Sequence, residues 1–296
     1  MTDTTRRPIL VGVDGSSSSL QAVRWAAREA ARRGVPLTLL HSCFVPSPEP
    51  YTPIRLPRTY RQALLDQGRE WLADAESAAR EAAPDIAVTT QLHTGGAADQ
   101  LIRESGAVGL VVLGSRGLGG FTGLLLGSVA VALAAHSHGS VVVVRGESAP
   151  DTGSIVVGVD GSPLSDAAVD FAFAAASSRG VPLVAVHAWT AHALQDSWVV
   201  LPMRIDYEAV AEDEEQLLAD RLSAWQAKYP DVEVRQRVIQ DRPAHALLTE
   251  AHDAQLIVVG SHGRGRLTGL GLGSTSQALL HHSECPVAVI RPDTAG

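Results

Sequence analysis

The amino-acid sequence repeats itself at a constant spacing of 146 residues. The segment ILVGVDGS at residues 9–16 returns as IVVGVDGS at 155–162, and GVPL at 34–37 returns at 180–183. A constant offset from one end of the chain to the other indicates a duplicated domain, and 296 residues suffice for two domains of ordinary size. We therefore expect two domains, residues 1–147 and 148–296, that meet within the polar stretch 147–154.

Short apolar runs alternate with helical segments within each half. In the first half we expect strands at 9–13, 37–41, 86–92, 110–113 and 141–144, and helices at 17–33, 59–82, 97–104 and 128–135. The second half repeats this order, with its long helix at 206–229, and five prolines between 46 and 57 indicate a loop in the first half. Strands that alternate with helices predict an α/β fold, in which helices cover both faces of a parallel sheet.

Each half contains one glycine-rich motif of identical spacing, Gly-x2-Gly-x9-Gly-Ser, at residues 114–128 and 260–274. Each motif follows a wholly apolar run. A glycine-rich loop that leaves a buried strand and enters a helix exposes backbone N–H groups that can bind phosphate. A flexible linker is the alternative interpretation, and two copies of identical spacing weigh against it.

Asp14 and Asp160 follow the first strand of each half, in the sequence Asp-Gly-Ser, which is also a turn and helix-cap sequence. Ligands of open parallel sheets bind outside the carboxyl ends of the strands, so ligand contact is the favoured interpretation. His41 and His187 close the second strands, and we expect them to be buried and hydrogen-bonded rather than catalytic.

Several other functions conflict with the sequence. The only lysine, Lys228, does not follow a glycine, which excludes a Walker-type loop, and Thr122 stands where the Rossmann fingerprint needs its third glycine or an alanine. A net charge of −8 argues against a nucleic-acid partner. No apolar stretch reaches the roughly 20 residues of a membrane span. The spacings of His136 with His138 and of His281 with Cys285 suggest a metal site only at first glance, because no further ligand is apparent.

The two glycine motifs, the Val-Gly-Val-Asp-Gly-Ser segments and Cys285-Pro286-Val287 resemble the universal stress protein family, in its tandem two-domain form. The resemblance covers residues 9–145 and 155–291. It implies two tandem doubly wound domains, each a five-stranded parallel sheet of order 3-2-1-4-5 with helices on both faces. It also implies ATP binding, with or without Mg²⁺, because this glycine motif marks the ATP-binding subset of the family.

The resemblance implies a nucleotide site in each half. Asp14 would lie near the base and ribose, Ser42 and Leu113 beside the adenine, and the glycine motif around the phosphates. The implied residues of the first site are Gly12, Asp14, Ser42, Leu113, Gly114, Ser115, Arg116, Gly117, Gly127, Ser128 and Val129. Those of the second site are Gly158, Asp160, Ala188, Val259, Gly260, Ser261, His262, Gly263, Gly273, Ser274 and Thr275. Whether Arg116, Arg264 and Arg266 offset phosphate charge or are merely solvated stays open.

We therefore expect a cytoplasmic, ATP-binding regulatory protein of a stress response, which binds nucleotide without turning it over. His262 could serve as a base in the second site, but Arg116 takes its place in the first, which argues against a shared catalytic role. The alternatives are a slow ATPase or nucleotidyl-transferring enzyme, and an interaction scaffold with vestigial sites. The expected partners are an adenine nucleotide, a second copy of the chain in a homodimer and a regulatory protein, but neither nucleic acid nor a membrane.

Overall fold

The computed structural model describes residues 7–44, 58–118, 126–145, 152–190, 207–263 and 271–291. These residues form two compact units: unit 1 comprises those up to Arg145, and unit 2 those from 152 to 291. The prolines between 46 and 57 and the central parts of both glycine motifs, with Arg264 and Arg266, lie outside the described residues.

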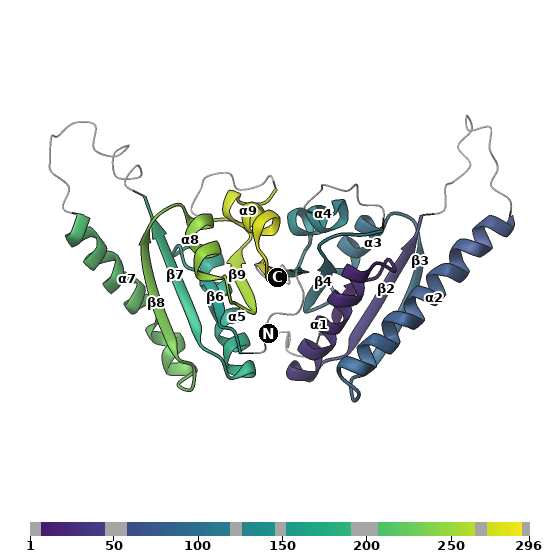
Figure 1. Ribbon diagram of the computed structural model, residues 1–296, viewed down its shortest axis with the longest axis horizontal. Helices are drawn as coiled ribbons and strands as arrows, with labels where there is room; N and C mark the ends of the chain where they lie inside the picture. Colours follow the sequence, from purple (N-terminus) through teal and green to yellow (C-terminus); the bar gives the residue numbers. More distant parts are fainter. Residues whose placement is uncertain are drawn as a thin grey trace. The chain divides into compact units, whose positions relative to one another are not determined.

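Unit 1 has nine elements in chain order (Figure 1). They are β1 (Ile9–Gly12), α1 (Ser17–Arg33), β2 (Leu37–Cys43), α2 (Arg58–Ala82), β3 (Val88–Thr94), α3 (Ala97–Glu104), β4 (Leu110–Gly114), α4 (Ser128–His136) and β5 (Val141–Val144). Unit 2 repeats the order. Its elements are β6 (Ile155–Gly158), α5 (Pro163–Arg179), β7 (Leu183–Trp189), α7 (Tyr207–Lys228), β8 (Val234–Gln240), α8 (Pro243–Glu250), β9 (Leu256–Gly260), α9 (Ser274–His282) and β10 (Val287–Ile290).

The sheet of each unit is parallel and has the expected order. The strands of unit 1 run β3-β2-β1-β4-β5, and those of unit 2 run β8-β7-β6-β9-β10. The register is also the same, because Ile9 pairs with Leu37 and Leu110, and Ile155 pairs with Leu183 and Leu256. The chain order reverses between β1 and β4, and between β6 and β9, which is where such sheets bind ligands.

Helices cover both faces of each sheet. In unit 1, α1 and α2 pack together on one face and α3 and α4 pack together on the other (Figure 1). The inner strands are apolar and almost wholly buried, as in Leu110–Gly114 and Val141–Val144. The expected α/β fold of two doubly wound units is therefore confirmed.

Most element boundaries agree with those predicted from the sequence, but those of the polar edge strand β3 do not. The helices at 17–33 and 97–104 and the strand at 141–144 are as expected. The expected strand at 86–92 is β3, Val88–Thr94, because Ile86 instead closes a turn with its N–H bonded to the carbonyl of Ala83. The threonine, glutamine and histidine residues of β3 are half-buried or exposed. The apolar run at 86–88 therefore did not mark the start of this strand.

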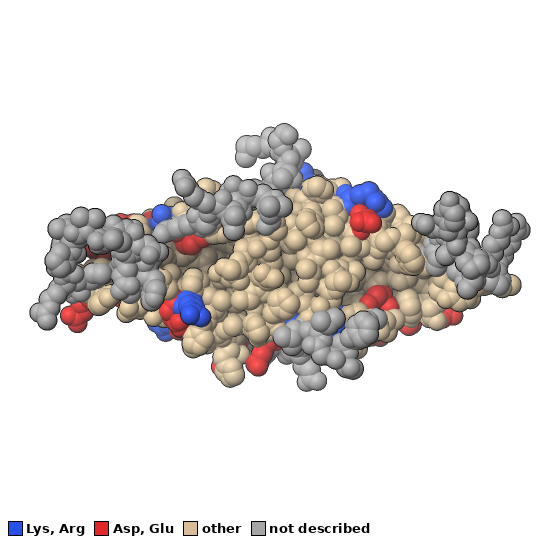
Figure 2. Space-filling view, turned by 90° about the horizontal axis from the view of Figure 1, so that it is seen from above, with Lys and Arg blue, Asp and Glu red and all other residues tan. Residues whose placement is uncertain are grey.

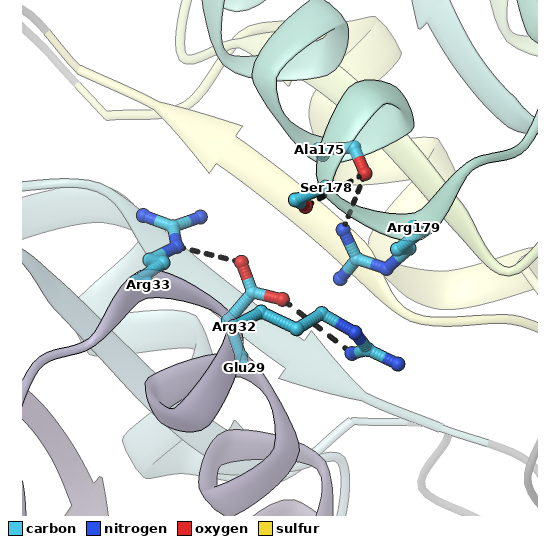
Figure 3. A network of polar contacts seen from close by, with 6 residues as sticks. All are labelled: Glu29, Arg32, Arg33, Ala175, Ser178 and Arg179. Atoms are coloured by element: carbon cyan, nitrogen blue, oxygen red, sulfur yellow. Dashed lines mark hydrogen bonds and ion pairs between the residues drawn. The ribbon is translucent and has the colours of Figure 1, made fainter.

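The last turns of α1 and α5 show how the two units have diverged at equivalent positions. In unit 1 the buried carboxylate of Glu29 accepts a hydrogen bond from Arg33 Nε at 2.6 Å and lies 3.8 Å from Arg32 (Figure 3). In unit 2 alanine replaces this glutamate, and Arg179 donates instead to the backbone carbonyl of Ala175 at 3.1 Å. The same helix end is thus stabilised by an ion pair in one unit and by a backbone contact in the other.

Candidate functional site

Unit 1 contains a cavity of about 440 Å³ at the carboxyl ends of β1, β2 and β4. The amino-terminal ends of α3 and α4 close its other side. Of the residues implied for the first site, all but Ser115 line this cavity: Gly12, Asp14, Ser42, Leu113, Gly114, Arg116, Gly117, Gly127, Ser128 and Val129. One cavity at the reversal of strand order therefore unites segments that lie far apart in the sequence.

Unit 2 contains an equivalent cavity of about 540 Å³ at the carboxyl ends of β6, β7 and β9. All residues implied for the second site except Ser261 line it: Gly158, Asp160, Ala188, Val259, Gly260, His262, Gly263, Gly273, Ser274 and Thr275. In the view of Figure 2, uncharged residues predominate and charged side chains are scattered.

Ser115 and Ser261 are the two implied residues that lie beneath the loops rather than in the cavities. Both are buried, with 5% and 2% of their surface exposed. Their N–H groups bond the carbonyls of Val144 and Ile290, and their own carbonyls accept from Gly127 and Gly273. They join the start of the glycine motif to its end, and so hold the loop in shape from below.

The helices that enter the cavities from the glycine motifs have glycine at the N-cap. Neither Gly127 before α4 nor Gly273 before α9 provides a side-chain hydrogen bond to the first turn. By contrast, Ser16 and Ser162 cap α1 and α5 by accepting from the N–H groups of Ser19 and Ser165. The first-turn N–H groups of α4 and α9 are therefore open to an anion, which the helix dipole also favours.

Asp14 connects the end of the first strand to the glycine loop. Its Oδ1 accepts from the N–H and the hydroxyl of Ser16, at 3.0 and 2.6 Å, and its Oδ2 accepts from the N–H of Leu118 at 3.1 Å. The N–H of Arg116 also donates to Ser18 Oγ at 3.3 Å. In unit 2, Asp160 Oδ1 accepts from the N–H of Ser162 at 2.9 Å. The carboxylate thus shapes the loop, in addition to facing the cavity.

Arginines stand close to both loops. Burial lowers the pKa of Arg145, which follows β5, and the nearby cation of Arg116 lowers it further. Burial likewise lowers the pKa of Arg291, which follows β10. An anion bound nearby would reverse these shifts, since an opposite charge favours the charged form of a guanidinium. Each cavity is thus lined by a carboxylate, that of Asp14 or Asp160, and has an arginine beyond its lining.

His41 and His187 are buried and hydrogen-bonded, as the sequence predicted. Each Nδ1 lies 2.7 Å from a strand-end carbonyl oxygen, that of Val13 or Val159. A carbonyl oxygen can only accept, so Nδ1 carries the proton in both residues. Both histidines also line the cavities, which the sequence analysis did not anticipate.

The sequence analysis missed several other lining residues. In unit 1 they are Val13, Ser19, Leu40, Ala97, Leu101, Leu126 and Ala130, and in unit 2 Val159, Ser165, Val186, Pro243, Leu247, Leu272 and Ser276. Most are the apolar neighbours of implied residues or belong to α3 and α8. The offset of 146 residues relates all of them in pairs, such as Leu101 to Leu247, so the repeat itself is a signal that could have identified them.

The cysteines and the acidic side chains offer no metal centre within the described ranges. No group of three or more His, Cys, Asp or Glu residues is placed to hold a metal there. Cys43 and Cys285 are both buried, and burial raises the pKa of each thiol. None of the described helices is long and apolar enough to cross a membrane.

Comparison with known proteins agrees with this architecture. The sequence matches the Universal stress protein family twice, over residues 5–145 and 152–291. The chain therefore belongs to this family and contains two of its domains in tandem. It is 41% identical to the universal stress protein Rv2005c of Mycobacterium tuberculosis over 290 residues, which cover 96% of each protein.

A solved structure shows the same fold. A universal stress protein from Archaeoglobus fulgidus covers 99% of this chain, and 99% of that protein is covered in return, with a TM-score of 0.73 and 19% identity. A universal stress protein in complex with cAMP is 28% identical, and the match covers 47% of this chain and 96% of that protein with a TM-score of 0.35.

Proposed function

We propose that this chain is an ATP-binding regulatory protein of a stress response, with one nucleotide site in each unit. The observation that supports it best is the repetition of one cavity in both units, built from the same positions of the repeat. Each cavity is lined by a glycine loop, an uncapped helix N-terminus and an aspartate. Two copies of one arrangement, in units that have diverged elsewhere, favour a retained ligand over an accident of folding.

The two ends of each cavity differ in chemistry, as an adenine nucleotide requires. In unit 1, Val13, Leu40 and Leu113 provide an apolar end, and the backbone of 114–117 and 127–130 a polar one. The volumes of about 440 and 540 Å³ lie within the range of about 300–1,000 Å³ that small-molecule sites occupy. We place the base against the apolar strand ends and the phosphates at the N-termini of α4 and α9.

Binding without turnover is part of the proposal. A hydrolase needs a base that can reach the attacking water. In unit 1 the carboxylate of Asp14 already accepts from Ser16 and Leu118, and Nδ1 of His41 donates to Val13. The carboxylate of Asp14 is thus engaged in holding the loop, and we expect release of inorganic phosphate to stay at background. Mg²⁺, if it accompanies ATP, would be held through the phosphates.

We predict two ATP molecules per chain. Both units retain the cavity, the aspartate and the glycine-capped helix, so each should bind independently. Calorimetric titration of ligand-free protein should give a stoichiometry near two. A value near one would show that one unit has lost its site, and no binding of ATP, ADP or AMP at millimolar concentration would refute the proposed function.

We also propose that the chain forms a homodimer in the cytoplasm and acts on a regulatory protein partner. The strand orders of the two units end at β3 and β8, and such edge strands can pair with those of a second chain. Light scattering should give twice the mass of one chain at micromolar concentration. Strict monomers over that range would contradict the homodimer and leave the nucleotide sites unaffected.

A further inference from the structure

The two sites differ at one position of the glycine motif. Arg116 in unit 1 corresponds to His262 in unit 2 at the offset of the repeat. Both residues line their cavities, but Arg116 is exposed and is a permanent cation. His262 is half-buried and can gain or lose a proton near physiological pH. The repeat therefore presents a fixed charge in one site and a titratable group in the other.

His262 has one ring nitrogen with a partner and one without. Its Nδ1 lies 3.2 Å from the hydroxyl oxygen of Ser261. Its Nε2 is buried and has no hydrogen-bond partner within the part of the chain that the structure describes. A buried nitrogen without a partner is unfavourable, and such groups commonly mark the place of a missing ligand. An oxygen of a bound anion would satisfy it.

Charged and titratable groups lie on several elements around His262. The carboxylate of Asp160 lies against the neighbouring Gly263, since a Cβ added there would be 2.6 Å from Oδ2. The other titratable group that lines the cavity is His187, and Arg291 follows the strand end that bonds Ser261.

We infer that His262 makes the second site the pH-sensitive one of the pair: it binds the phosphate chain as an imidazolium, so ATP binding at unit 2 takes up a proton. This inference rests on the proposed function. At unit 1 the guanidinium of Arg116 keeps its charge, and no proton is taken up. Because ATP binding and proton uptake are linked at unit 2, the affinity of unit 2 for ATP rises as the pH falls from 8 to 6. The affinity of unit 1 for ATP does not rise in this way. The two sites of one chain thus respond differently to acidification.

A second ionisable pair in unit 2 must be separated from this effect. Nε2 of His187 lies 3.0 Å from Glu214 Oε2, although that oxygen makes no well-directed hydrogen bond. In unit 1 the equivalent position is Gly68, and the ring of His41 packs edge-on against Trp71 instead. The His187–Glu214 contact would also respond to pH. The variant Glu214→Gln removes it and leaves His262 in place.

The test exchanges the two residues in the full-length chain. ATP is titrated calorimetrically at pH 6 and pH 8 into the parent, His262→Arg, Arg116→His and Glu214→Gln. One charge-assisted hydrogen bond accounts for about a tenfold change in affinity. In the parent, one of the two sites should bind about tenfold more tightly at pH 6. In His262→Arg neither site should show this gain, in Arg116→His both should, and Glu214→Gln should resemble the parent.

Each outcome decides a specific point. ATP binding that titrates equally at both parent sites, or that keeps its asymmetry in His262→Arg, would overturn the inference and leave the proposed function standing. Loss of the asymmetry in Glu214→Gln would also overturn it, by assigning the effect to His187.

If His262→Arg fails to fold, His262→Gln provides the neutral substitute, and it should lose the gain at pH 6. Absence of nucleotide binding at either site would refute the proposed function and the inference together. The ionisation of ATP itself acts on both sites and cancels in the comparison.

Discussion

Replacing Gly127 by Ala should abolish ATP binding at unit 1 and leave unit 2 unchanged. A Cβ added at Gly127 would make only ordinary contacts with the protein, the nearest being the carbonyl oxygen of Ser115 at 3.5 Å. Its backbone, with φ −74° and ψ 148°, suits alanine. The methyl group should therefore obstruct the ligand rather than the loop, and weaken binding by about 100-fold, or about 2.7 kcal/mol. Calorimetry should then report one ATP per chain.

The control is another glycine of the same unit. A Cβ at Gly106 would meet nothing nearer than His138 Cβ at 3.7 Å, so Gly106→Ala should keep two ATP. Alanine is a poorer N-cap than glycine, and Gly127→Ala should lower the free energy of unfolding by about 0.5–1 kcal/mol. A Gly127→Ala chain that folds and still binds two ATP as tightly as the parent would refute the close approach of phosphate to this backbone.

Gly127 is a sharper choice for this test than Gly117 or Gly263, which belong to the same two motifs. At Gly117 a methyl group would meet the carboxylate of Asp14, and at Gly263 it would lie 2.6 Å from that of Asp160. Neither glycine has a positive φ. Loss of ATP binding in Gly117→Ala or Gly263→Ala would therefore have two possible causes. The methyl group could displace the aspartate, or it could obstruct the phosphate.

Replacing Asp14 by Ala should weaken ATP binding at unit 1 by about 10–100-fold. The carboxylate accepts from Ser16 and from the N–H of Leu118, and hydrogen bonds to a charged group each contribute about 1.5–3 kcal/mol. Without it the loop loses its connection to the end of β1. The family resemblance implies that Asp14 lies near the base and ribose, away from the phosphate end of the site. The bond to Leu118 leads us to expect that both ends suffer, so affinity for inorganic triphosphate should fall as well.

Two variants bracket this prediction. Asp14→Asn keeps the shape but can no longer accept at both oxygens, and its affinity should lie between those of the parent and Asp14→Ala. Asp85→Ala removes an exposed aspartate of the same unit and should change nothing. If Asp14→Ala loses affinity for ATP but retains that for triphosphate, the carboxylate acts on the nucleoside and the proposed role in the loop is wrong.

Much of the fold could be predicted because it depends on features that short segments display. Buried parallel strands such as 110–113 and 141–144 are continuous apolar runs, and α1 has a serine cap and a glycine end that mark its limits. β3 was predicted two residues early because a half-exposed edge strand need not be apolar. Its pairing with β2, from Val88 at Leu37 to Thr94 at Cys43, decides its ends, and no local pattern records that partner.

The site was partly predictable for the same reason. Motifs that repeat, such as the glycine loops and the aspartates, were visible as residue types at fixed spacings. The burial of Ser115 and Ser261 was not, since it depends on β5 and β10 passing beneath the loop. Gly68 and Glu214 occupy equivalent positions of the repeat, but the sequence does not show what they contact. Only the structure shows that Gly68 lies against His41 of β2 and Glu214 against His187 of β7.

The central claim is that each unit binds ATP with its phosphates at the glycine motif. Backbone amide NMR of the full chain during titration with ATP and with inorganic triphosphate tests this most directly. We predict that ATP shifts the amides of 114–118 and 127–130 in unit 1 and of 260–263 and 273–276 in unit 2, and that triphosphate shifts the same amides. Amides near Ser42 and Ala188 should respond to ATP alone. Saturation with ATP that leaves the amides of both glycine motifs unmoved would contradict the account.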